Sequence, residues 1–392
     1  MYNPNKKTSL ETHFALAVFN TAVNSGCLRN HLTFIKTYKE ITGREVPAVT
    51  DGSIKRYEVS SASLNDKIIV DVWVPEGYDG TDTSVTYPVI YAHDGQNLFD
   101  PKLSYANVAW EIDATATRLI SDGSIIAPII VGISNRGAKG LRANDYFPEK
   151  AIQYIPESER DKTLIYDTCK DVFFGDQEAE FVTLELKPLI DNLYRTSPDR
   201  EHTFAMGSSM GGLASLYLMC EYPEVFGGAA CLSTHWIGSL HINPDYTLQD
   251  DPVCAAAILE YMDHSLPSPL DHRLYLDEGT VGWDSQYIPY ENSACEIARQ
   301  HGYSEAKGSL MTYVAQNAGH NEWYWQQRID RPLKFLLNPK ALATITDIPV
   351  NTGEENTQMI IDLKGNQFHP SRLNSLPSGI YIQGRRKLII RR

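Results

Sequence analysis

The sequence predicts an α/β fold in which a mostly parallel central sheet is flanked by helices. Short continuous apolar runs, such as residues 88–93 (PVIYAH) and 125–133 (IIAPIIVGI), have the pattern of strands that are buried on both faces. Segments with apolar residues at helical spacing separate these runs. Because a strand, a helix and a further strand in succession favour a right-handed βαβ unit, this alternation indicates that the strands run parallel.

The strands are expected at intervals along most of the chain. In order, they fall at residues 67–75, 88–93, 125–133, 202–206, 228–232, 273–276 and 310–314. The first of them alternates and is rich in β-branched residues, whereas most later ones are short apolar runs. Together with the helices between them they provide the elements of a large α/β domain.

Apolar residues at helical spacing predict the helices between these strands. They fall at residues 108–119, 181–193, 211–221, 291–301 and 322–337. Because proline lacks a backbone N–H, Pro188 is expected to kink the second helix, and Pro223 to end the third. Residues 135–176 are polar, aromatic and weakly periodic, so we expect a long insertion there, over the C-terminal edge of the sheet where binding loops gather.

The composition changes at both ends of this pattern. Residues 1–50 hold one short apolar run, which is shorter than the core of a signal peptide, and we interpret them as a poorly specified leader. Residues 51–339 carry the α/β pattern. Residues 340–392 contain short alternating segments (MIIDL, IYIQG and KLIIR) with Gly and Pro turns and no helical pattern. They predict a separate small all-β unit.

Composition and charge exclude several classes of partner. The net charge of -14, with no long basic run before the last few residues, argues against nucleic acid or an anionic membrane as the main partner. No apolar stretch reaches the roughly 20 residues that a membrane-spanning helix needs. The six cysteines form no C-x-x-C pair, and there is no P-loop, no G-x-G-x-x-G and no cluster with metal-ligand spacing. We therefore expect neither a metal ion nor an organic cofactor.

A candidate nucleophile lies in the segment GSSMG, residues 207–211, which fits G-x-S-x-G with Ser209 at its centre. The motif follows the predicted strand HTFAM and opens the predicted helix GGLASLYLMCE. This strand–turn–helix context is what the nucleophile elbow of an α/β-hydrolase requires. The flanking glycines allow strand and helix to approach closely around a strained serine. A Gly-rich turn without chemistry is the alternative that this context disfavours.

A serine hydroxyl needs a base, and in this fold the order along the chain is serine, acid, histidine. His320 follows the last predicted core strand and precedes the closing helix, which is where the base is expected. The acid should follow the strand RLYL. We favour Asp284, because it lies far enough past the strand to reach back to His320, with Asp277 and Glu278 as the alternatives. The acid would hold the imidazole in the right tautomer and stabilise its charged form.

The oxyanion hole needs two backbone N–H groups. Met210, which follows the nucleophile, is expected to supply one, and Gln96, in the loop after the strand VIYAH, the other. Several aromatic residues fall in predicted loops or near strand ends around this site, where they could stack on an aromatic acyl group or a sugar ring. These candidates for substrate binding are Trp110, Tyr146, Trp236 and Trp283.

The segments YPVIYAHDGQNLFD, AMGSSMGG, LDEGTVGWDSQY and AGHNEWYW resemble the esterase D superfamily. That superfamily includes enterochelin-esterase-like enzymes, S-formylglutathione hydrolases, and carbohydrate esterases such as feruloyl and acetyl xylan esterases. The resemblance covers roughly residues 51–339. It implies an α/β-hydrolase fold, no metal or organic cofactor, and a triad and oxyanion hole formed by the residues already singled out: Ser209, Asp284, His320, Gln96 and Met210.

The tail carries a second resemblance. The segment IIDLKGNQF, followed by LPSGIYIQGRRKLIIRR, is similar to C-terminal sorting domains of the type IX secretion system. This resemblance implies that the secretion machinery is a partner of residues 340–392 and that the protein is secreted or placed on the cell surface. Export fits esters attached to a polymer better than a cytosolic substrate.

Together these observations predict an exported serine carboxylic-ester hydrolase that removes feruloyl or acetyl groups from plant polysaccharide through an acyl-enzyme on Ser209. One alternative is an esterase of an enterochelin-like siderophore, which would cleave a catechol trilactone. An alternative of another class is a non-catalytic carbohydrate-binding surface protein that keeps the fold without the chemistry. The ordered serine, acid and histidine favour an enzyme over this last alternative.

Overall fold

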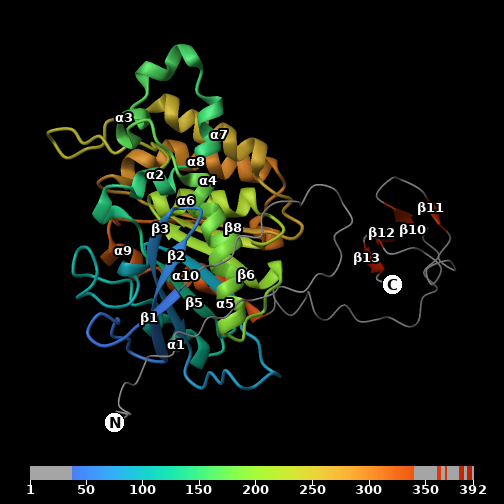
Figure 1. The fold of residues 1–392 in the computed structure, drawn as a ribbon. Helices are drawn as coiled ribbons and strands as arrows, with labels where there is room; N and C mark the ends of the chain where they lie inside the picture. Colours follow the sequence, from blue (N-terminus) through green and yellow to red (C-terminus); the bar gives the residue numbers. More distant parts are fainter. Residues whose placement is uncertain (1–37, 340–359, 363–366, 369–378, 384–385, 391–392) are drawn as a thin grey trace, which may run out of the picture. The chain divides into compact units, whose positions relative to one another are not determined.

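The computed structural model describes residues 38–339, 360–362, 367–368, 379–383 and 386–390 (Figure 1). The chain divides into two compact units, Met1–Pro339 and Lys340–Arg392, and each is described here by itself. In the described parts of the second unit, four short strands pair antiparallel in the order β11-β10-β12-β13. Their bounds are β10 Ile360–Asp362, β11 Gln367–Phe368, β12 Gly379–Gln383 and β13 Arg386–Ile390.

A nine-stranded sheet forms the centre of the first unit, with the order β1-β2-β3-β5-β4-β6-β7-β8-β9. The strands from β5 to β9 in this order run parallel, whereas β1, β2, β3 and β5 pair antiparallel. The sheet is therefore mixed and mostly parallel. Its strands are β1 Tyr38–Ile41, β2 Ser53–Ser61, β3 Asp66–Val74, β4 Val89–His93, β5 Ile129–Ile133, β6 Thr203–Ser208, β7 Gly228–Leu232, β8 Arg273–Gly279 and β9 Leu310–Ala315.

Helices cover both faces of this sheet. The α-helices are α1 Ile112–Ser121, α2 Arg142–Tyr146, α3 Ile165–Cys169, α4 Gly175–Glu180, α5 Lys187–Leu193, α6 Met210–Glu221, α7 Pro252–Ser265, α8 Asp284–Gln300, α9 Glu322–Gln326 and α10 Asp330–Leu336. Helix α6 contacts β4, β6 and β7. It is buried on all sides except at its C-terminal residue, which matches its uniformly apolar sequence.

The strand order places a switch point between β4 and β6. The connection from β4 through α1 leads to β5 on one side, whereas the connection from β6 through α6 leads to β7 on the other. Right-handed crossovers in opposite directions put α1 and α6 on opposite faces of the sheet. The loops that follow β4 and β6 therefore meet at the carboxyl edge, which is where open α/β sheets bind their ligands.

Two predicted helices are interrupted at prolines. The segment 181–193 begins as a π-helical turn, Phe181–Leu186, which follows α4 and continues into α5. Since Pro188 has no N–H and would clash with the carbonyl four residues earlier, the wider π turn accommodates it. The predicted closing helix 322–337 is divided into α9 and α10, with Pro332 in the first turn of α10, where its missing N–H is tolerated.

Other element boundaries differ from the sequence prediction. Strand β1 lies within the stretch expected to be a leader, and it pairs with β2, a strand that was not predicted as such. Helix α8 begins at Asp284 rather than at residue 291, since its first turns are polar and Pro289 lies inside it. The predicted insertion, residues 135–176, contains α2, α3 and short 3-10 turns.

Five cysteines lie in the described part of the chain, and all are buried free thiols. They are Cys169, Cys220, Cys231, Cys254 and Cys295. Burial raises the pKa of Cys169 and that of Cys295 to about 12. Among the described residues, no helix is both long enough and apolar enough to cross a membrane.

Candidate active site

Ser209 occupies a tight turn between β6 and α6. Its backbone has φ 58° and ψ -127°, a conformation that a non-glycine residue adopts only when the surroundings enforce it. A Cβ on Gly207 would lie 2.3 Å from the carbonyl oxygen of Gly211, so only glycine fits where strand and helix approach. The turn is therefore a nucleophile elbow, as the motif predicts.

The loop after β4 lies against this elbow. A Cβ on Gly211 would lie 3.2 Å from the Cβ of His93 and 3.4 Å from a carboxylate oxygen of Asp94. On the other side, a Cβ on Gly212 would lie 2.9 Å from the hydroxyl of Thr234. Small residues at the start of α6 thus let three chain segments meet around Ser209.

His320 is the partner of Ser209. Its Nε2 lies 2.8 Å from the hydroxyl oxygen of Ser209, and its Nδ1 lies 2.6 Å from Oδ1 of Asp284. The imidazole is enclosed by three aromatic rings, with ring centroids 5.0 to 5.6 Å away: those of Trp283, Tyr287 and Trp325. Packing on these sides fixes the ring orientation, so His320 can bridge the hydroxyl and the carboxylate at once.

Asp284 is fully buried and holds its charge through hydrogen bonds. Its Oδ2 accepts from the hydroxyl of Ser233 at 2.6 Å and from the backbone N–H of Gly279 at 2.8 Å. Burial alone would raise its pKa, but the hydrogen bonds and charges of His320 and its other neighbours outweigh that effect and lower the pKa. The carboxylate also sits in the first turn of α8, where the helix dipole favours a negative charge.

The two alternative acids have other surroundings. Asp277 forms a buried ion pair with Arg328, with Nη2 2.9 Å from Oδ1 and Nε 3.0 Å from Oδ2, and also accepts from the hydroxyl of Tyr275. Glu278 is buried, and its Oε2 has no hydrogen-bond partner. Neither contacts His320 in any recorded hydrogen bond, so the geometry singles out Asp284. The residue lies at a helix start, however, and not in the loop expected from the sequence.

Ser233 connects Asp284 with Arg328, and it was not among the site residues predicted from the sequence. Its hydroxyl donates to Asp284 and accepts from Trp325 Nε1 at 3.1 Å and Arg328 Nη2 at 2.7 Å. A polar residue directly after the buried strand β7 is the signal that could have identified it. Nothing in the sequence pairs the serine with Arg328, which follows 95 residues later.

The environment of Glu278 predicts that the free energy of unfolding depends on pH. Burial, then the charges of Asp284 and Asp277, raise its pKa to about 7. The folded state therefore holds this proton over a pH range in which the unfolded chain, with an ordinary pKa of about 4.3, has lost it. Stability from this group falls as pH rises through that range, by on the order of 3 kcal/mol. Glu278→Gln should remove the loss, so the variant should gain stability over wild type as pH rises from 5 to 8.

Urea unfolding of both proteins at several pH values measures this gain. Glu296→Gln, which makes the same chemical change on the exposed surface of helix α8, is the control and should shift the unfolding midpoint little at any pH. A stability difference between Glu278→Gln and wild type that is constant across the pH range would contradict the assignment.

The predicted oxyanion donors lie on either side of Ser209. Met210 is the first residue of α6, where a backbone N–H has no partner within the helix. Gln96 lies in the 3-10 turn Gly95–Asn97, in the loop that packs against the elbow. For both N–H groups the structure records no acceptor among the described residues. A Cβ on Gly95 would lie 2.4 Å from Gly132, which explains the glycine before Gln96.

Three of the four aromatic residues predicted to bind substrate are buried in the structure. Trp110, Tyr146 and Trp236 have exposed fractions of 1%, 2% and 0%, so none offers a face to a ligand. Tyr146 accepts from the backbone N–H of Asp94, and Trp236 Nε1 donates to Glu291. Large apolar rings near a strand end can equally fill the core, and the sequence pattern does not distinguish the two environments.

Trp283 differs from these three. It is partly exposed, its ring lies 5.6 Å from that of His320, and its Nε1 donates to the carbonyl oxygen of Tyr246. It therefore lies at the boundary between the triad and solvent. Among the described residues, no group of three or more His, Cys, Asp or Glu side chains is arranged to hold a metal ion.

Comparison with solved structures finds the same fold. A ferulic acid esterase superposes with a TM-score of 0.52 and 18% sequence identity, over 74% of this chain and 99% of that one. The enterobactin esterase of Shigella flexneri, in the presence of enterobactin, superposes with a TM-score of 0.52 and 17% identity, over 75% of this chain and 61% of that one. At these identities the likeness shows the α/β-hydrolase fold alone.

Sequence comparison gives the family. The uncharacterized protein YjcH of Bacillus subtilis (strain 168) is 26% identical over 180 residues, which cover 46% of this chain and 61% of the relative. The match thus spans about three fifths of the length of that relative. The model of the Esterase family matches residues 61–336, which is well over half of the chain and includes every residue of the site. The chain therefore belongs to the Esterase family and has the α/β-hydrolase fold.

Proposed function

We propose that the chain is a serine carboxylic-ester hydrolase that works through an acyl-enzyme on Ser209. The observation that carries this proposal is the continuous hydrogen-bonded series from the Ser209 hydroxyl through His320 to Asp284, with contacts of 2.8 and 2.6 Å. Membership of the Esterase family supports it, and disfavours the non-catalytic carbohydrate-binding alternative.

Each group has a defined role in this proposal. The hydroxyl oxygen of Ser209 attacks the ester carbonyl carbon while Nε2 of His320 takes its proton. The negative oxygen that forms is stabilised by the N–H groups of Gln96 and Met210. When the carbon–oxygen bond to the alcohol breaks, the alcohol leaves with the proton from His320. A water molecule then repeats the sequence and releases the acid, and Asp284 stays ionised throughout.

Labelling with a fluorophosphonate probe tests the nucleophile, since such probes react with an activated serine. Intact-mass measurement should find one adduct on the wild type and none on Ser209→Ala. Ser208→Ala is the matched control, because Ser208 is the neighbouring buried serine on β6 and has no contact with His320 in any recorded hydrogen bond. Equal labelling of Ser209→Ala, or an adduct mapped to another residue, would refute the proposal.

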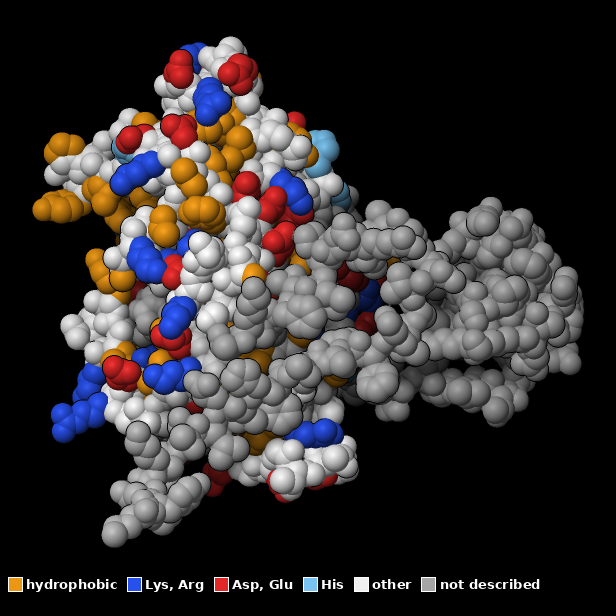
Figure 2. Space-filling view, in the orientation of Figure 1, with side chains coloured by type: hydrophobic (Ala, Val, Ile, Leu, Met, Phe, Trp, Pro, Cys, Tyr) orange, Lys and Arg blue, Asp and Glu red, His pale blue; other side chains and the backbone are white. Residues whose placement is uncertain are grey.

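We propose further that the substrate is an acyl group, of feruloyl or acetyl type, carried by plant polysaccharide. Aromatic side chains that are exposed near the triad support a sugar-binding surface, because sugar rings stack on aromatic faces. Tyr246 is 83% exposed and its backbone is bound to Trp283, and Trp323, on α9, is 51% exposed. Figure 2 shows hydrophobic side chains gathered where the loop before α7 projects.

A substrate panel distinguishes this proposal from siderophore hydrolysis. Methyl ferulate, feruloylated and acetylated xylan, and a catechol trilactone should be compared by kcat/KM. The proposal expects the highest value for one of the polysaccharide esters, and Tyr246→Ala should lower it for the polymer more than for methyl ferulate. Preference for the trilactone would instead assign the enzyme to siderophore ester hydrolysis.

We propose that residues 340–392 direct export through the secretion machinery. The support is the resemblance of this segment to type IX sorting domains, together with its separation from the esterase unit. Fractionation of producing cells should find the full chain outside the cytoplasm, and a chain that ends at residue 339 retained inside. Equal distribution of both would reject this role for the tail.

A further inference from the structure

The loop that carries Gln96 is held in an unfavourable conformation at its first residue. Asp94 has φ 58° and ψ 43°, in the left-handed region that non-glycine residues seldom occupy. Aspartate tolerates this region better than most side chains do, but the conformation still costs free energy that the contacts around it offset. The position of the Gln96 N–H, two residues later, therefore depends on what holds Asp94.

Three side chains from beyond the next strand hold it. The carboxylate of Asp94, which is 3% exposed, accepts from Arg142 through Nε at 2.9 Å and Nη2 at 2.6 Å, and from Asn135 Nδ2 at 2.5 Å. Its backbone N–H donates to the hydroxyl of Tyr146 at 3.1 Å. Asn135 also donates its own N–H to the side chain of Gln96 at 3.3 Å.

Asp94 remains charged in this setting. Burial would raise its pKa, but the charge and the paired hydrogen bonds of Arg142, helped by Asn135, outweigh burial and lower the pKa. A bidentate arginine–carboxylate pair fixes direction as well as distance, because two parallel bonds cannot both survive a rotation of either group. Arg142 thus sets the orientation of the Asp94 side chain.

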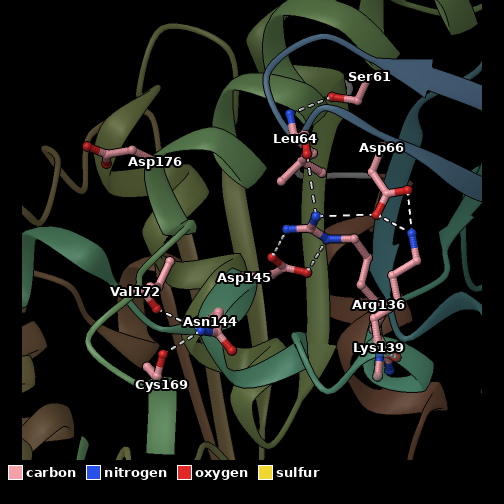
Figure 3. A network of polar contacts seen from close by, with 12 residues as sticks. Ser61, Leu64, Asp66, Arg136, Lys139, Asn144, Asp145, Cys169, Val172 and Asp176 are labelled. Carbon is pink, nitrogen blue, oxygen red and sulfur yellow. Dashed lines mark hydrogen bonds and ion pairs between the residues drawn. The ribbon is translucent and has the colours of Figure 1, made fainter. Parts of the chain in front are cut away.

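Arg142 is the first residue of the short helix α2, which is held in place by contacts with residues outside the helix. Helix α2 has only five residues, too few to be stable alone. Figure 3 shows its anchors: Arg136 binds Asp145 of α2 and Asp66 of β3, and Asn144 Nδ2 donates to the carbonyl oxygens of Cys169 and Val172 at 2.8 and 2.7 Å. The insertion is therefore a rigid support at this point.

We propose that Arg142 is a positioning residue for the oxyanion hole, acting through Asp94 on the backbone N–H of Gln96. The inference rests on the proposed serine mechanism, since it concerns the same site. On this inference residues 135–176 contribute to catalysis, because α2 supplies the arginine that aligns the loop after β4. Donors in an oxyanion hole stabilise charge only when they are held at the right place beforehand.

A cavity behind Arg142 provides the means to test this role. The arginine side chain is 25% exposed, and it borders a cavity of about 450 Å³. The other lining residues are Gly137, Gly140, Ala143, Thr168, Leu240, His241 and Ile242. Removal of the arginine side chain would open a path from this cavity to the Asp94 carboxylate, which a guanidinium ion is small enough to enter.

Arg142→Ala should lower kcat for p-nitrophenyl acetate by about 10- to 100-fold, with KM changed less than about threefold, because a displaced donor weakens the transition state more than the bound ester. Added guanidinium at millimolar concentration should restore part of kcat in Arg142→Ala but not in the double variant Asp94→Asn, Arg142→Ala. Arg142→Lys, which keeps the charge without the planar fork, should fall between wild type and Arg142→Ala.

Two further measurements separate positioning from other roles. The inhibition constant of a phenylboronic acid, whose serine adduct places an oxygen in the oxyanion hole, should rise in parallel with the loss of kcat. Thr168→Ala, which alters the same cavity away from Asp94, should leave kcat for p-nitrophenyl acetate unchanged. Circular dichroism and thermal unfolding establish that each variant is folded, and Arg142→Lys carries the test if Arg142→Ala is not.

The outcomes distinguish this inference from the mechanism on which it rests. If KM rises while kcat stays, Arg142 binds substrate directly and the positioning role is wrong. If neither constant changes, or if guanidinium restores nothing although the variant is folded, the role is also wrong. Each of these results leaves Ser209-dependent hydrolysis intact, whereas failure of the mechanism itself would appear as unchanged hydrolysis by Ser209→Ala.

Discussion

Replacement of Ser209 by alanine should lower kcat for any ester substrate by about 10⁴- to 10⁶-fold, as for the nucleophile of other triad hydrolases. The change removes one oxygen atom, whose recorded hydrogen bond is to His320. Without it no acyl-enzyme can form, and the oxyanion donors can only assist a direct attack by water. Stability should change little, since alanine and serine adopt the φ of 58° at this turn at similar cost.

Steady-state hydrolysis of p-nitrophenyl acetate by both proteins, with unfolding measured in parallel, checks this expectation. The uncatalysed rate must be subtracted, because it will exceed the rate of the variant. Ser208→Ala should retain most of the wild-type kcat. A Ser209→Ala protein that is folded and keeps a tenth or more of the activity would mean that another group performs the attack.

The second large effect is expected for Asp284→Asn, with a loss of about 10⁴-fold in kcat. An amide at this position can turn its NH₂ group toward Nδ1 of His320, which places the imidazole proton on Nε2. A protonated Nε2 cannot accept the proton of Ser209, and the imidazolium that forms in the reaction also loses its carboxylate. The hydrogen bond of 2.6 Å between His320 and Asp284 makes this dependence direct.

Glu278→Gln is the matched control for this variant, since it makes the same chemical change in the segment that leads to α8. It should keep kcat within a few-fold of wild type at neutral pH. If Asp284→Asn were fully active while Glu278→Gln were not, the acid of the triad would be Glu278, one of the alternatives that the sequence left open.

Much of the site could be predicted because its signals are local. Ser209 stands in a five-residue motif between a strand and a helix, and the elbow follows from the glycines that let these elements meet. His320 follows a recognisable core strand. Asp284 was selected by its distance from the strand, although β8 continues through Gly279 and α8 begins at Asp284 itself. Asp284 lies within hydrogen-bond distance of His320 because only a short turn connects the two elements.

The remainder depends on contacts between residues that are distant in the sequence. Arg328 lies 51 residues from Asp277, and Arg142 lies 48 residues from Asp94, and no local pattern indicates either pair. The aromatic candidates failed for a related reason. Trp236 is fully buried against Glu291 and Trp283 is partly exposed, yet both follow strands of the same sheet. Burial is set by the elements that pack over a residue, and these come from elsewhere in the chain.

The buried thiols bear on how the protein responds to oxidants. A thiol is attacked by oxygen species and by other thiols as its thiolate, and burial raises the pKa of Cys169 and Cys295 to about 12, so little thiolate exists at neutral pH. Burial raises the pKa of Cys220, Cys231 and Cys254 as well. The described cysteines are thus poorly reactive toward oxidants at neutral pH, because both burial and the scarcity of thiolate protect them.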